Sequence, residues 1–127
     1  MTEEPDPRLV ELAHQLFDLA RQGDTERLAA YVDAGAPVDL TDAQGNTLLM
    51  LAAYHGHAAT VRALAERGAD VNRLNDRGQS PLAGAVFKGE DDVVAALREH
   101  GADPDAGTPS ARATAEMFGR HDLLADG

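Results

Sequence analysis

The stretch Gly68-Ala69-Asp70 recurs as Gly101-Ala102-Asp103, and the interval between the two copies is 33 residues. Counting back by the same interval reaches Gly35-Ala36, where proline follows in place of aspartate. Two further series of glycines keep this interval, namely Gly23, Gly56 and Gly89, and then Gly45 and Gly78. Because three separate series share one period, the sequence predicts an array of structural repeats.

Each period is predicted to hold two helices joined by a tight turn. In residues 47–54, the hydroxyl of Thr47 can cap the first free N–H groups, and apolar helix formers follow. In residues 57–66, apolar side chains recur at helical spacing, and Gly68 supplies the left-handed residue that ends a helix. The next period repeats this plan over 80–88 and 91–99. The segments between the pairs are rich in Asn, Asp and Gly, which favour turns.

The two ends of the array depart from this plan. The first helix is expected to start as far back as Asp6 or Pro7, and the second to cover residues 25–34. In the last repeat, Ser110 follows Ser80 by only 30 residues, so about three residues are missing around 105–108. Its second helix, from about Arg120, holds barely one turn, and we expect this end to fray. We expect helices to pack closely at four alanines, Ala52, Ala53, Ala85 and Ala95.

The pattern resembles the ankyrin repeat. Residues 47–53, Thr-Leu-Leu-Met-Leu-Ala-Ala, are similar to the T-P-L-H-x-A-A of that family, and Ser80-Pro81-Leu82 opens a second version. Gly56-His57 matches its G-H, and residues 68–72 match its G-A-D-V-N. The resemblance implies an all-α solenoid of about four helix–turn–helix repeats with short β-turn fingers. It forms one domain over 1–127, with repeats at about 7–40, 41–74, 75–107 and 108–127, and the first and last act as caps.

Composition narrows the classes of function. The chain has no cysteine, which removes disulfides and thiolate chemistry. The formal charge of −11 disfavours binding to nucleic acid or anionic membranes. It favours a partner protein with a basic patch, although acidity also serves solubility alone. Residues 1–7 are acidic, unlike a secretory signal, and no apolar run approaches the ~18 residues of a membrane span. We expect a cytoplasmic protein.

Candidate catalytic and metal-binding groups have structural explanations. His55 and His57 bracket Gly56 at the turn between two helices, and His57 matches a structural histidine of the family. Three acids, Glu90-Asp91-Asp92, lie at a helix N-terminus, which attracts negative charge. The two serines, Ser80 and Ser110, lie at predicted helix caps. We therefore expect no catalytic residue, no cofactor and no metal, and a protein that is not an enzyme.

The resemblance implies protein binding along the concave face, through the finger tips and the exposed side of each first helix. Tyr54 and Phe87 lie 33 residues apart and are the expected aromatic anchors. The predicted partner-binding residues are Arg21, Gln22, Ala43, Gln44, Asn46, Tyr54, His55, Asp76, Arg77, Gln79, Phe87 and Lys88.

Two alternatives to a regulatory or accessory binding module stay open. Self-association through the short last repeat would use Met117, Phe118, Leu123 and Leu124, so that a monomer is the first expectation and a weak dimer the second. An acidic inhibitor that mimics nucleic acid and occupies a basic groove is the other.

Overall fold

The computed structural model describes residues 6–125; residues 1–5 and 126–127, at the two ends of the predicted 1–127 domain, lie outside the described residues. Between residues 6 and 125 there is no strand, and one isolated antiparallel bridge joins Thr41 to Thr47. The elements are α1 (Pro7–Gln22), α2 (Thr25–Asp33), α3 (Leu48–Tyr54), α4 (Ala58–Glu66), α5 (Pro81–Lys88), α6 (Asp91–Glu99), α7 (Ala111–Met117) and a 3-10 helix η1 (His121–Leu124).

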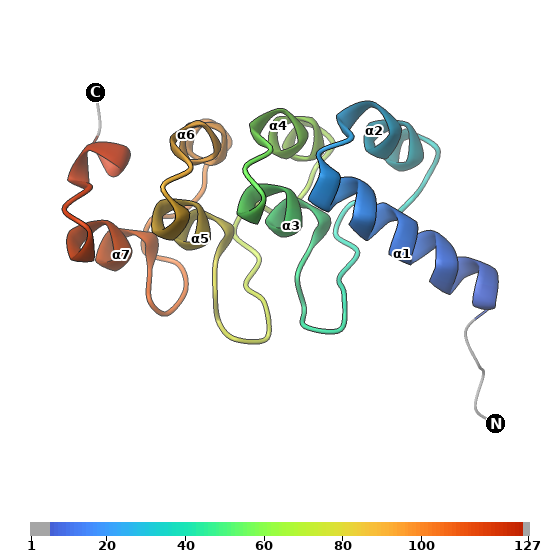
Figure 1. Cartoon of the computed structure of the whole chain (residues 1–127), viewed down its shortest axis with the longest axis horizontal. Helices are drawn as coiled ribbons and strands as arrows, with labels where there is room; N and C mark the ends of the chain where they lie inside the picture. Colours follow the sequence, from blue (N-terminus) through green and yellow to red (C-terminus); the bar gives the residue numbers. More distant parts are fainter. Residues whose placement is uncertain (1–5, 126–127) are drawn as a thin grey trace.

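The helices stack in two parallel rows (Figure 1). One row holds the inner helices, α1, α3, α5 and α7, and the other holds the outer helices, α2, α4, α6 and η1. Strong contacts join each helix to its neighbours in the same row and to its partner in the other row. The predicted all-α solenoid is therefore confirmed. Three loops extend beside the first row, and we call residues 40–46, 73–79 and 106–109 the first, second and third fingers.

Hydroxyl caps begin three of the four helices in the first row, as predicted. The side chains of Thr47, Ser80 and Ser110 accept hydrogen bonds from the backbone N–H groups three residues later, at 3.1, 3.0 and 3.1 Å. In the remaining helix, α1, the carboxylate of Asp6 accepts from the Arg8 N–H at 2.9 Å, and Pro7 opens the first turn. These caps satisfy N–H groups that lack partners within the helix.

Aliphatic side chains fill the space between the rows. Leu49, Leu64, Leu82 and Leu97 are almost fully buried, and Ala52, Ala53 and Ala85 allow the predicted close approach of helices. The prediction for Ala95 was wrong: Ala95 is exposed, whereas Ala96 is buried. Val93, Val94 and Leu97 already define the inward stripe of α6, and a residue two positions after Val93 points to the opposite side.

A ladder of hydrogen bonds repeats along the base of the stack, where each outer helix leads into a finger. The carboxylate of Asp39 accepts from the backbone N–H of Asp70 at 2.9 Å. One repeat later, the side-chain oxygen of Asn72 accepts from the backbone N–H of Asp103 at 2.7 Å. Each repeat thus satisfies a backbone donor of the next one, which sets their register.

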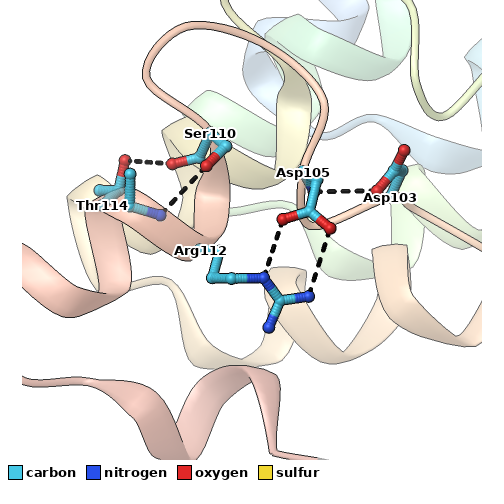
Figure 2. A network of polar contacts seen from close by, with 6 residues as sticks. Asp103, Asp105, Ser110, Arg112 and Thr114 are labelled. Carbon is cyan, nitrogen blue, oxygen red and sulfur yellow. Dashed lines mark hydrogen bonds and ion pairs between the residues drawn. The ribbon is translucent and has the colours of Figure 1, made fainter.

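The third finger is shorter than the second, as predicted. Residues 100–110 connect α6 to α7, whereas the longer stretch 67–80 connects α4 to α5. Arg112 holds the short loop, because its guanidinium donates to both carboxylate oxygens of Asp105 at 2.8 and 3.4 Å (Figure 2). This ion pair lowers the pKa of Asp105, chiefly through the side-chain hydrogen bond. The backbone N–H of Thr108 also donates to the Gly78 carbonyl at 2.9 Å.

Candidate functional site

The predicted partner-binding residues all belong to the inner helices, to residues directly after them, or to the first two fingers. Four are partly buried, namely Arg21, Asn46, Tyr54 and Gln79. The others are exposed, namely Gln22, Ala43, Gln44, His55, Asp76, Arg77, Phe87 and Lys88. The inner helices and the fingers lie on the same side of the stack (Figure 1), so the segments that carry these residues lie on that side.

A pocket of about 420 Å³ opens on this side between α3, α5 and α7. Its walls are largely apolar, and its rim carries a few polar groups. We call it the α5 pocket, and its lining residues are Tyr54, Gln79, Ala83, Gly84, Phe87, Lys88, Pro109 and Thr114. Four of them are predicted partner-binding residues: Tyr54, Gln79, Phe87 and Lys88. Their separate positions in the sequence converge because successive inner helices lie side by side.

Tyr54 owes its position to the absence of a side chain at Gly84. A Cβ atom added at Gly84 would overlap the Tyr54 ring, so the ring lies directly on the backbone of α5. Glycine inside a helix costs roughly 1 kcal/mol relative to alanine. The close approach of the ring is what the glycine makes possible. Partial burial raises the pKa of the Tyr54 phenol above its ordinary value of 10.0.

Phe87 is 65% exposed and meets a second aromatic residue that the sequence did not single out as a contact for it. The rings of Phe87 and Phe118 pack edge to face, with centroids 5.6 Å apart and an interplanar angle of 73°. Phe118 is itself 50% exposed, and the neighbouring Met117 is 72% exposed. The α5 pocket therefore continues into an exposed apolar patch at the last repeat.

Pro109 and Thr114 also line the α5 pocket, and sequence reasoning missed them as site residues. The shortened third finger packs against the second: a Cβ at Gly107 would come within 3.0 Å of the Gly78 carbonyl oxygen. The hydroxyl of Thr114 donates to the Ser110 carbonyl at 2.8 Å (Figure 2). The three-residue deletion was visible in the sequence, and it was the signal that this finger has its own shape.

A second groove, of about 660 Å³, lies between α1 and the first finger on the same side of the stack. Arg21, Ala43 and Gln44 line it, together with residues such as Val10 and Phe17. The Arg21 guanidinium is held by the Asp18 carboxylate at 3.0 Å, and both side chains remain substantially exposed. Seven of the twelve predicted residues thus line one of the two hollows.

Two of the predicted residues also hold the fingers together. The side-chain amide of Asn75, which is largely buried, donates to Asn46 Oδ1 at 2.9 Å and to Gln79 Oε1 at 2.8 Å. Its oxygen accepts from the backbone N–H groups of Arg77 and Gln79, both at 3.0 Å. Because Asn46 and Gln79 are engaged in this network, they position the first two fingers relative to each other.

The two histidines that bracket Gly56 have different environments. His57 Nε2 donates to the Arg21 carbonyl at 2.7 Å, and the ring covers Gly23 so closely that a Cβ there would overlap it. His55 is exposed, and its Nδ1 bonds the Leu51 carbonyl of its own helix at 2.8 Å. Among residues 6–125 no group of three or more His, Asp or Glu side chains is arranged to hold a metal ion. The helices described here include none that is long and apolar enough to cross a bilayer.

Comparison with known proteins is consistent with this architecture. Residues 16–108 match the family model described as ankyrin repeats, in three copies. The chain is also similar to a curated ankyrin repeat protein of Pseudomonas aeruginosa, with 53% identity over 66 residues. That alignment covers 49% of this chain and 39% of the relative, so the chain spans well under half of the relative's length.

Proposed function

This chain belongs to the ankyrin-repeat family, and from that premise we propose that it binds a cytoplasmic partner protein along its inner helices and fingers, in a regulatory or accessory role. Ankyrin repeats generally act as protein–protein interaction modules and are typically non-enzymatic. The observation that carries the choice of face is the convergence of Tyr54, Gln79, Phe87 and Lys88 on one apolar pocket. Apolar pockets with exposed aromatic walls are where interface anchors insert.

The net charge of the chain indicates what kind of partner protein it would attract. With 22 Asp and Glu against 11 Lys and Arg, the chain carries a formal charge of −11, which steers positively charged partners toward it at low ionic strength. A partner with a basic patch is therefore favoured, and its rate of association should fall as salt is added. If that basic patch lines a nucleic-acid-binding groove, this chain would be the acidic inhibitor that occupies the groove.

The test is affinity capture of the partner from a lysate of the cells that make the protein. The double variant Tyr54→Ala/Phe87→Ala should lose the partner while its far-ultraviolet circular dichroism stays unchanged. Tyr31→Ala is the matched control, because Tyr31 is a part-exposed aromatic residue of α2 that lines neither hollow of the proposed face. Equal recovery with the double variant and the wild type would refute the choice of face.

Self-association is the second candidate, because Met117 and Phe118 expose apolar surface at the end of the stack. Leu123 and Leu124, the other two residues predicted for this contact, are half-buried against the core. Sedimentation over a range of concentrations separates the candidates. A dimer that dissociates in the Phe118→Ser variant would support self-association. A protein that stays monomeric would exclude self-association over the concentrations tested.

A further inference from the structure

We propose that the α5 pocket binds a short segment of the partner in which a large apolar side chain stands within two positions of an aspartate or glutamate. This inference rests on the proposed function and specifies what the side formed by the inner helices and fingers recognises. It follows from the apolar walls of the pocket and from the single basic side chain among its lining residues.

The apolar part of the recognition comes from the walls. Tyr54, Ala83, Gly84, Phe87 and Pro109 surround a volume of about 420 Å³, which lies within the ~300–1,000 Å³ of ligand pockets. Phe87, one of these walls, is 65% exposed. An inserted side chain would cover this ring, and burial of apolar surface is the main favourable contribution to such binding.

The acidic part of the recognition comes from Lys88. Among the residues that line the α5 pocket, Lys88 is the only lysine, arginine, histidine, aspartate or glutamate. Its Nζ donates to the Tyr54 carbonyl at 2.6 Å, which holds the ammonium group at the wall of the pocket. An ammonium group has three N–H donors, so two can still donate to acceptors that a bound segment supplies.

A segment that covered Lys88 with apolar groups alone would remove water from the ammonium without replacing the lost hydrogen bonds. A carboxylate from the segment supplies a charge-assisted acceptor instead. Complementarity therefore requires an acid close to the apolar side chain. This local preference is compatible with a basic partner. The net charge of the chain governs attraction at long range, whereas Lys88 alone governs the contact inside the pocket.

The test uses an array of synthetic peptides in which Leu or Phe stands beside Asp, Asn, Lys or Ala, probed with the full chain. We expect the Asp peptides to bind about fivefold more tightly than their Asn counterparts, the upper range for an exposed ion pair. Lys88→Glu should transfer the preference to the Lys peptides. Phe87→Ala should weaken all of them about tenfold, as expected for an anchor.

Arg73→Glu is the matched control, since it makes the same change of charge at an exposed residue outside the α5 pocket and should keep the preference for Asp. Equal binding of Asp and Asn peptides, a preference that survives Lys88→Glu, or no peptide binding at all would overturn the inference. So would a dimer that Phe87→Ala abolishes, because a second copy would then fill the pocket. If capture of the partner protein still depends on Tyr54 and Phe87, such a result would refute this inference and leave the proposed function standing.

Discussion

His57 is a single side chain that joins two repeats. Its ring covers Gly23 at the end of α1, and its Nε2–H donates to the carbonyl of Arg21. This carbonyl is one of the last in α1, and such carbonyls find no N–H partner within the helix. His55, two positions earlier, bonds only within α3. The two histidines thus provide a matched pair for measuring what a bond between repeats contributes.

Replacing His57 should therefore cost more than replacing His55. We expect His57→Ala to lower the free energy of unfolding by about 1–2 kcal/mol, because it leaves a partly buried carbonyl unpaired and opens space beside Gly23. His55→Ala should change it by less than about 0.5 kcal/mol, as for most exposed positions. Urea unfolding followed by circular dichroism measures both. Equal losses would mean that the bond to Arg21 contributes nothing to the joint between repeats.

At the scale of elements, two ion pairs tie the outer helices together. Arg67, at the end of α4, donates to Asp33 at the end of α2 at 2.9 and 3.2 Å. Arg62 of α4 donates to Glu99 of α6 at 3.2 and 3.4 Å. Hydrogen bonds from these guanidinium groups hold the pKa values of Asp33 and Glu99 below their ordinary values of 3.8 and 4.5.

These shifts predict a direction for the dependence of stability on pH. A carboxyl group whose pKa is lowered in the folded state contributes stability above its ordinary pKa, and the contribution disappears as pH falls through the lowered value. The double variant Asp33→Asn/Glu99→Gln should be less stable than the wild type at pH 7, by a small amount because both pairs are exposed. The difference should shrink below pH 4.5 and in high salt. A difference that stayed constant down to pH 2 would exclude these pairs as its source.

The elements show which features the sequence could predict. Helix starts at Thr47, Ser80 and Ser110 were predictable because a cap is a contact between residues three positions apart. The short third finger was predictable from a count of residues. The contact between Phe87 and Phe118 could not be predicted, because it depends on the distance between α5 and α7 in the folded chain. The seat of Tyr54 on Gly84 likewise requires knowing the spacing between helices.

At the scale of the whole molecule, stability should be shared among the repeats, because each helix pair buries its apolar face against its neighbours. Leu64→Ala removes a side chain that is 1% exposed between α4 and its neighbours, and should cost about 2–5 kcal/mol. Leu74→Ala, at a position that is 42% exposed on the second finger, should cost no more than about 0.5 kcal/mol.

Circular dichroism and tyrosine fluorescence during urea unfolding of both leucine variants measure these costs. The two probes should report one shared transition in each variant, as in the wild type. If Leu64→Ala separated the transitions, the middle of the stack would be unfolding on its own and the repeats would be less coupled than their packing implies.

The hydrogen-bond ladder at the base of the stack also makes the length of the molecule adjustable. Asp39 and Asn72 perform the same task one repeat apart, and the N–H groups they satisfy belong to the equivalent residues Asp70 and Asp103. If residues 48–80 were duplicated in tandem, each of these hydrogen bonds would again find its donor and its acceptor. Glu66 would then take the position of Asp33 as the partner of the second copy of Arg67. The repeats are therefore interchangeable at this ladder, and a longer stack requires only additional copies of the same repeat.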